Sequence, residues 1–198
     1  MSKHPAAIPH DRPIVPFETA QAWEAWLTKH GGDSPGIYIK IAKKGSGVLS
    51  ITYAEALDIA LCHGWIDAIK RSFDDTFFLQ KFLPRTPKSI WSQINKKKVQ
   101  ALIKAKLMRP AGLAAVKQAK ANGQWVKAYA PASTITVPSD LEAALKKNKK
   151  AAAFFNTLKG SNRFAILHRL HTASKEETRA KRLALFMGML ERGETIHG

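Results

Sequence analysis

The sequence is poor in cysteine, in acidic residues and in long apolar runs, and each shortage excludes a class of protein. Cys62 is the only cysteine among 198 residues, so an intramolecular disulfide is impossible and nothing points to an oxidising compartment. No apolar run reaches transmembrane length, and residues 1–18 hold no run suited to a signal peptide. We therefore expect no membrane span, and we expect the cytoplasm as the location.

The shortage of acidic residues leaves a strongly basic chain. Thirty-two Lys and Arg stand against 15 Asp and Glu, which gives a net charge of +17. Between Lys70 and Arg109 the only acidic residues are Asp74 and Asp75. Such a surface attracts polyanions such as nucleic acid or an acidic protein. It is also what a solubilising surface requires, so both interpretations stay open.

The common cofactor and catalytic motifs are missing as well. The sequence has no GxGxxG, GxxxxGK[ST] or GxSxG pattern, so dinucleotide-binding, P-loop and α/β-hydrolase assignments lack their basic parts. His168 and His171 are spaced i, i+3, but no HExxH or CxxC accompanies them. We therefore expect no cofactor and no metal.

Residue patterns predict an α+β fold, with a small antiparallel sheet and flanking helices followed by a helical C-terminal region. A capping box at Thr52–Glu55 predicts a helix start, and two runs with strand character predict a hairpin. Further capping boxes are predicted at Ser139–Glu142 and Ser174–Glu177. The expected parts are an extended N-terminal segment (1–16), an α+β body (17–108), a helix and connector (109–138), and a helical region packed on the body (139–198).

The stretch from Trp65 to Asn95 gathers polar side chains beside large aromatic residues. Buried polar groups must find partners, so such a set predicts either a ligand pocket or an internal hydrogen-bond network that joins the hairpin to the next helix. Asp67 is the best candidate for a functional carboxylate. The candidate pocket residues are Trp65, Asp67, Arg85, Ser89, Trp91, Ser92 and Asn95.

A second candidate set consists of cations interleaved with phenylalanines. Charge together with stacking is how single-stranded nucleic acid is bound without reading its sequence. The same phenylalanines also suit the core of a small domain. The cations of this alternative surface are Lys70, Arg71, Lys81, Lys88, Lys96 and Lys97.

Arg179 lies on the same helical line as Leu183 and Phe186, on the inward side of the last predicted helix. A guanidinium in that position usually meets a carboxylate or carbonyl oxygens. We expect Arg179 to be structural.

Several blocks of the sequence resemble the YdeI/OmpD-associated family, also called bacteriocin-protection proteins. They are Ala60–Asp67 (ALCHGWID), the PR…SxWSxxN block from Pro84 to Asn95, Met108–Gly112, and Glu177–Arg182 in the closing helix. Ala68 departs from the glycine expected after WID. The resemblance implies an α+β body with a helical C-terminal part and a link to envelope stress or bacteriocin tolerance. It implies no established reaction and no catalytic residue.

Three functions follow from these observations. The leading hypothesis is a cytoplasmic, non-enzymatic binding or interaction protein that takes a small ligand or an acidic partner. The alternatives are a nucleic-acid-binding protein that uses the surface of residues 70–109, and an enzyme with Asp67 as acid or base. No residue pattern specifies the ligand, the partner or the oligomeric state.

Overall fold

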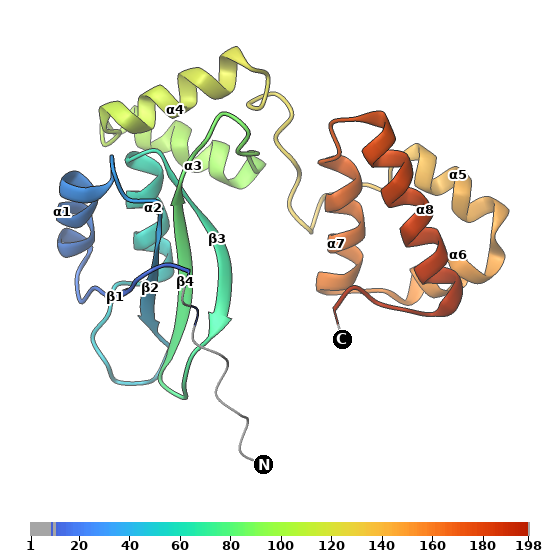
Figure 1. The fold of residues 1–198 in the computed structure, drawn as a ribbon, viewed down its shortest axis with the longest axis horizontal. Helices are drawn as coiled ribbons and strands as arrows, with labels where there is room; N and C mark the ends of the chain where they lie inside the picture. The colour runs from blue at the N-terminus through green and yellow to red at the C-terminus, as the bar shows by residue number, and fades with distance from the viewer. Residues whose placement is uncertain (1–8, 10, 198) are drawn as a thin grey trace. The chain divides into compact units, whose positions relative to one another are not determined.

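The computed structural model describes residue 9 and residues 11–197. The chain forms two compact units (Figure 1). The first takes in the described residues up to 89 together with residues 95–126, and the second takes in residues 90–94 together with residues 127 onward. The predicted α+β fold is confirmed.

The first unit is built on a four-stranded sheet in the order β1-β2-β4-β3. The strands β2 (Ile37–Ala42), β4 (Phe77–Pro84) and β3 (Trp65–Ser72) pair antiparallel, so the predicted hairpin is confirmed. β1 (Ile14–Pro16) pairs parallel with β2, so the sheet is mixed, whereas the sequence indicated only its antiparallel strands. A three-residue edge strand that follows one proline and ends on another shows no alternation from which to read it.

The helices of this unit are α1 (Ala20–His30), α2 (Tyr53–Cys62), α4 (Pro110–Ala121) and α3 (Gln93–Lys104) from residue 95 onward. The predicted capping box opens α2, because Thr52 Oγ1 accepts from the Glu55 amide while the Glu55 carboxylate accepts from the Thr52 amide at 2.9 Å. α1 and α2 lie beside the sheet (Figure 1).

An aromatic cluster joins α1 to the sheet. The Trp23 ring of α1 lies 6.2 Å from the Trp65 ring of β3 and 5.7 Å from the Phe82 ring of β4. Trp23 is fully buried, and its indole N–H donates to the Ala56 carbonyl of α2 at 3.0 Å. α1, α2 and the sheet therefore share one core, with the one indole donor of Trp23 satisfied inside it.

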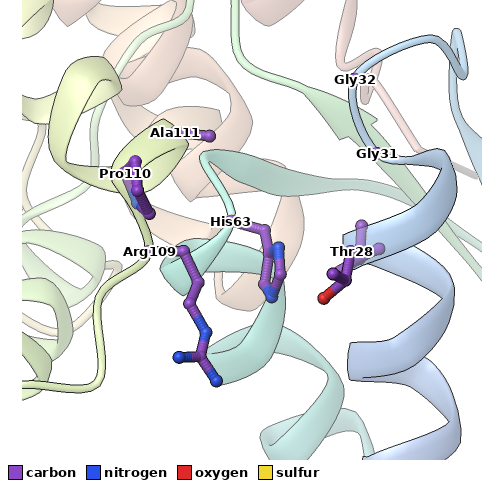
Figure 2. A pocket seen from close by; sticks show the side chains of 8 residues that line it. Thr28, Gly31, Gly32, His63, Arg109, Pro110 and Ala111 are labelled. Carbon is purple, nitrogen blue, oxygen red and sulfur yellow. The ribbon is translucent and has the colours of Figure 1, made fainter.

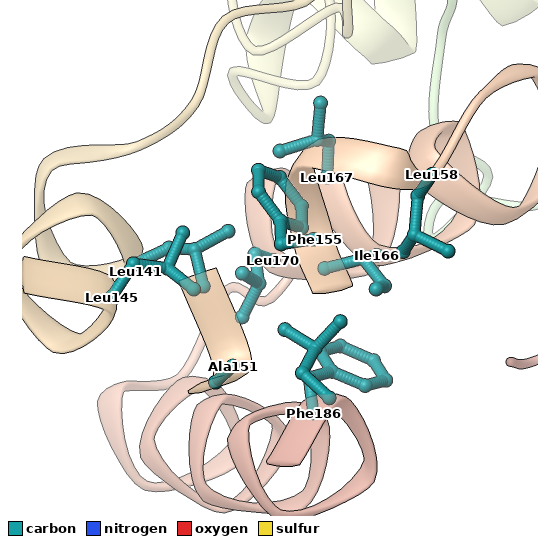
Figure 3. Packing of buried hydrophobic residues seen from close by; sticks show 10 residues of the cluster. Leu141, Leu145, Ala151, Phe155, Leu158, Ile166, Leu167, Leu170 and Phe186 are labelled. Carbon is teal, nitrogen blue, oxygen red and sulfur yellow. The ribbon is translucent and has the colours of Figure 1, made fainter. Parts of the chain in front are cut away.

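The second unit contains α5 (Ser139–Lys147), α6 (Lys149–Thr157), α7 (Gly160–His171) and α8 (Glu176–Arg192). Their apolar faces meet in one core, shown in Figure 3. Its residues are Leu141, Leu145, Ala151, Phe155, Leu158, Ile166, Leu167, Leu170, Phe186 and Leu190.

Two predicted capping boxes in the second unit were wrong. The N-cap residues are Pro138 and Lys175, and neither caps its helix with a side chain. Ser139 is already the first residue of α5, and the side chain of its neighbour Asp140 is held by Arg179. The predicted boundary after residue 108 separates α4 from the body, whereas α4 belongs to the first compact unit. The packing of residues 139–198 on the body stays a prediction. Across the described residues, no helix is long and apolar enough to cross a bilayer.

Candidate functional site

Two pockets in the first unit share the residues Gly31, His63 and Ala111, and together they form what we call the His63 groove. Figure 2 shows the larger of the two. Their volumes are about 530 and 340 Å³, within the range of small-molecule sites. The larger pocket is also lined by Leu27, Thr28, Gly32, Arg109 and Pro110, and the smaller one by Gly64, Trp65, Pro84, Arg85, Ala114, Ala115 and Gln118.

His63 lies where α2 ends and the chain turns into β3. It is the C-cap residue of α2, and its amide donates to the Ile59 and Ala60 carbonyls. Gly64 follows with φ of 76°, a left-handed conformation that suits glycine. A Cβ at Gly64 would lie 2.8 Å from the Ala111 carbonyl oxygen, so this turn also requires glycine for its close approach to α4.

The start of α4 forms the facing wall of the groove. The Arg109 amide donates to the Cys62 carbonyl at 3.0 Å, which ties the beginning of α4 to the end of α2. Arg109 is the N-cap of α4 and makes no side-chain capping bond, and Pro110 occupies the first turn. Figure 2 shows the His63 imidazole between Arg109 and Thr28, which come from opposite sides of the larger pocket.

The His63 imidazole is enclosed and lacks a partner at one nitrogen. Its side chain is 9% exposed, and Nε2 finds no hydrogen-bond partner among the described residues. The Glu24 carboxylate oxygen lies 4.0 Å away, beyond hydrogen-bond distance. Burial lowers the pKa of His63; Glu24 opposes this effect and Arg109 adds to it. His63 is therefore mainly neutral near pH 7.

Arg109 and Glu24 form an ion pair beside this histidine. The Arg109 Nε donates to Glu24 Oε1 at 3.1 Å, and Nη2 reaches the same oxygen. This bond raises the pKa of Arg109. Glu24 does not line either pocket among the described residues, so Arg109 and Arg85 are the charged side chains of the lining and His63 is its titratable imidazole.

Two residues of the predicted pocket, Trp65 and Arg85, line the smaller pocket. The indole N–H of Trp65 donates to the Gly31 carbonyl at 3.1 Å, and the Arg85 amide donates to the Gly64 carbonyl at 2.9 Å. Asp67 lies farther along β3, where its carboxylate accepts from the Tyr53 hydroxyl at 2.7 Å. The described lining of the groove does not include Asp67.

The other predicted pocket residues lie around the start of α3. The Ser89 hydroxyl accepts from the Thr86 amide at 2.9 Å, and Asn95 is buried on α3. Trp91 and Ser92 belong to the second unit, where this segment pairs with Tyr129 through a 3.0 Å bond from the Tyr129 amide to the Trp91 carbonyl. A pocket that contains the complete set stays a prediction.

The six cations of the alternative surface are distributed over several parts of the first unit. Lys70 pairs in register with Gln80, whereas Lys81 is the next residue along β4, so Lys70 and Lys81 point to opposite faces of the sheet. Lys81 forms an ion pair with Asp11, and its ammonium lies 5.2 Å from the Tyr38 ring. The others are Lys96, 5.3 Å from the Trp125 ring, and the exposed Arg71, Lys88 and Lys97.

Arg179 holds three helices of the second unit together. Its guanidinium donates to both oxygens of Asp140 on α5, at 2.6 and 2.8 Å, and to the Leu170 carbonyl of α7 at 2.7 Å. It thus meets both kinds of acceptor that the sequence indicated. The bond from Arg179 lowers the pKa of Asp140.

The two histidines at i, i+3 make separate contacts. The His171 Nε2 bonds to the Thr136 carbonyl at 2.9 Å, while the His168 ring packs edge-on against the Tyr129 ring at 4.4 Å. Burial lowers the pKa of His168. Within the described part of the chain, no group of three or more potential metal ligands is present.

Residues 15–115 match the family model described as Domain of unknown function (DUF8412), and this match covers just over half of the chain. The chain belongs to the DUF8412 family. The whole described lining of the His63 groove except Gln118 falls within the DUF8412 match.

Residues 134–193 match the model described as Bacteriocin-protection, YdeI or OmpD-Associated. The resemblance to that family is therefore confirmed, for one of the two units only. Of the blocks that carried it, Glu177–Arg182 lies in this match, whereas Ala60–Asp67, Pro84–Asn95 and Met108–Gly112 lie in the DUF8412 match. No curated protein and no solved structure matches the chain.

Sequence reasoning missed His63, Arg109 and Glu24 as parts of one site in the DUF8412 unit. His63 and Arg109 lie inside blocks that the resemblance had marked: His63 directly precedes Gly64-Trp65 in Ala60–Asp67, and Arg109 directly follows Met108 in Met108–Gly112. The signal that could have found them is this position beside glycines that permit close backbone approach.

Proposed function

We propose that the DUF8412 unit is a non-catalytic, small-molecule-binding domain whose ligand lies in the His63 groove. The observation that carries the proposal is the enclosed His63 Nε2, which finds no hydrogen-bond partner among the described residues. A buried polar atom without a partner costs roughly 1–3 kcal/mol. A ligand that supplies the partner removes this cost, so the arrangement favours an occupied groove.

Binding is favoured over catalysis by the groups that stand near His63. The neighbouring thiol of Cys62 is buried, and burial raises its pKa to about 11, so it is not an activated nucleophile. The Thr28 hydroxyl donates its hydrogen to the backbone carbonyl of Glu24 at 2.9 Å, rather than to a side chain that could act as a base. Asp67, the residue of the enzyme alternative, is hydrogen-bonded to Tyr53.

A fragment screen by NMR on the ¹⁵N-labelled full chain tests the proposal. Fragments that bind the groove shift the amide signals of His63, Gly64 and Ala111. The variant Ala114→Trp fills the smaller pocket from an exposed helical position, and it should abolish or weaken these shifts. Ala101→Trp, at an exposed position on α3 outside the described lining, is the matched control.

The proposal fails if no fragment shifts these signals, or if Ala114→Trp binds every fragment as the wild type does. A fragment that binds wild type and Ala101→Trp equally, and Ala114→Trp at least tenfold more weakly, supports it.

A second candidate function is nucleic-acid binding, which the net charge of +17 favours. It predicts retention of single-stranded DNA or RNA with an affinity that falls steeply as salt is raised, because counterions are released on binding. The position of Lys70 and Lys81 on opposite faces of the sheet speaks against one continuous surface for it. A salt-independent affinity, or no retention at physiological salt, rules this function out.

For the second unit we propose the role that its family description names, protection against a bacteriocin or association with OmpD, exerted from the cytoplasm. Cells that express the full chain should survive a bacteriocin challenge better than cells that express residues 1–126. Equal survival would contradict the protective role.

A further inference from the structure

We infer that the ligand of the His63 groove carries an oxyanion head group, a carboxylate or a phosphate, which Arg109, His63 and the first turn of α4 hold together. This inference rests on the proposed function and names its ligand class. Three independent features of the groove support it.

The first feature is the charge of the lining. Arg109 and Arg85 contribute two positive charges, and the described lining residues include no carboxylate. Glu24 lies beside both residues: its Oε1 is 4.0 Å from His63 Nε2 and already accepts two bonds from the Arg109 guanidinium, which offsets its negative charge. Arg109 Nη1 is not used in this pair, so a planar donor stays available to an anion.

The second feature is the start of α4. A helix of 12 residues presents unsatisfied amide N–H groups and a partial positive charge at its N-terminus. The Arg109 side chain has no oxygen with which to cap them, and no side-chain capping bond is made. Ala111, in this first turn, lines both pockets of the groove. Such a helix start binds anions readily.

The third feature is His63 itself, which stands opposite this helix start. Nε2 can donate to an anion either as the neutral Nε2–H tautomer or as imidazolium. The charged or titratable groups around it are Glu24 from α1, Arg109 at the start of α4, Arg85 at the end of β4 and the Cys62 thiol of α2. Neutral His63 is compatible with the two arginines, and a bound anion would favour its protonation.

The rest of the groove is lined largely by apolar residues, so we expect the remaining part of the ligand to be apolar. Leu27 and Pro110 line the larger pocket, and Trp65, Pro84 and Ala115 line the smaller one. An anion with a small aromatic or aliphatic body matches this combination of charged and apolar walls.

Three probes of similar size test the inference on the full chain: 3-phenylpropionate, phenyl phosphate and the neutral 3-phenylpropionamide. Binding is measured at pH 7 by the shifts of the His63, Ala111 and Gly112 amide signals. We expect at least one anion to bind tenfold more tightly than the amide. The anion that binds more tightly identifies the head group as carboxylate or phosphate.

Arg109→Met removes one donor. It should lower the affinity for 3-phenylpropionate and phenyl phosphate at least tenfold and leave the affinity for 3-phenylpropionamide unchanged. Arg192→Met is the matched control, because Arg192 is similarly exposed and also pairs with a nearby carboxylate, Glu194. His63→Gln should likewise lower the affinity for the two anionic probes. This second variant keeps the inference testable if Arg109→Met does not fold.

The inference is overturned if the amide binds the groove as tightly as both anions, or if Arg109→Met and His63→Gln bind the anions as the wild type does. Either result leaves the proposed function intact, because a ligand still occupies the groove. If no probe and no screening fragment shifts the groove signals, the proposed function itself fails.

Discussion

Gly112 packs against the carbonyl of Cys62 so closely that a Cβ at position 112 would lie 2.1 Å from that oxygen. The contact joins the first turn of α4 to the end of α2, and the His63 groove lies beside this joint. The shape of the groove therefore depends on a residue that has no side chain.

Substituting Gly112 should destabilise the first unit. Gly112→Ala forces α4 away from α2, because the contacted atoms are backbone, and overpacking of this kind costs about 1–3 kcal/mol. The measurement is the urea midpoint followed by tryptophan fluorescence. Gly32→Ala is the control, since a Cβ there meets nothing within 4 Å, and it should change the midpoint little. Equal midpoints for both variants would contradict the close packing.

The pKa of His63 should respond in opposite directions to two substitutions. Glu24→Gln removes the carboxylate that raises the pKa of His63 and should lower it further, whereas Arg109→Met removes a cation and should raise it. NMR titration of the imidazole signals measures both, with His171→Gln as an assignment control. Shifts in the same direction would contradict the arrangement of the three residues.

Stability should also depend on pH through His63. Its folded pKa lies below the unfolded value of about 6.5, so the unfolded chain takes up the proton first as pH falls. The contribution of neutral His63 to the free energy of unfolding is fully present above pH ~6.5. It is lost as pH falls through that value towards the folded pKa. His63→Gln should therefore lose less stability between pH 7.5 and 5 than the wild type, in urea unfolding at each pH. A larger loss would contradict the depressed pKa.

Arg179→Met should loosen the second unit. The guanidinium bonds to Asp140 and to the Leu170 carbonyl are removed, at a cost of roughly 1–3 kcal/mol. Lys181→Met, which breaks the exposed pair with Glu177, should cost about 0.5 kcal/mol or less. Hydrogen exchange of the α5 and α7 amides compares the two variants.

The Arg179–Asp140 pair should also make the stability of the second unit depend on pH in the acidic range. The folded pKa of Asp140 is lowered, so its contribution is present above the unfolded pKa of about 3.9 and is lost as pH falls below it. Arg179→Met should therefore show a shallower acid loss of α5 and α7 protection than the wild type. An identical acid profile would mean that the pair is not formed in solution.

Asp67→Asn should leave the groove intact. The carboxylate bonds to Tyr53 at a part-exposed position and does not belong to the described lining, so we expect unchanged probe binding and a stability loss of about 1 kcal/mol. Loss of probe binding in Asp67→Asn would restore Asp67 to the site.

Local sequence patterns predicted most helices and strands of the fold, whereas they predicted only some residues of the site. Thr52 and Glu55 are three residues apart, so their capping box can be recognised without knowing the fold. Ser139–Glu142 has the same pattern but forms no box, because the helix begins one residue earlier than the pattern assumes. Capping patterns thus locate a helix start but do not fix which residue caps it.

The groove depends on contacts between residues far apart in the chain. Glu24 and Arg109 are separated by 85 residues, and no periodicity relates them. Trp65 and Arg85 were predicted as part of one polar and aromatic stretch, and they share a pocket because the hairpin register pairs Trp65 with Pro84. Asp67 shares that hairpin but engages Tyr53, since a strand residue two positions farther on lies roughly 7 Å along the sheet.

A crystal structure of the full chain with bound 3-phenylpropionate is the most direct test of the account. We predict that a carboxylate oxygen lies about 2.7–3.2 Å from His63 Nε2, within reach of Arg109, with the phenyl ring against the apolar wall of the groove. A probe bound on another surface, or one that fills the groove and leaves His63 Nε2 without a partner, would contradict it.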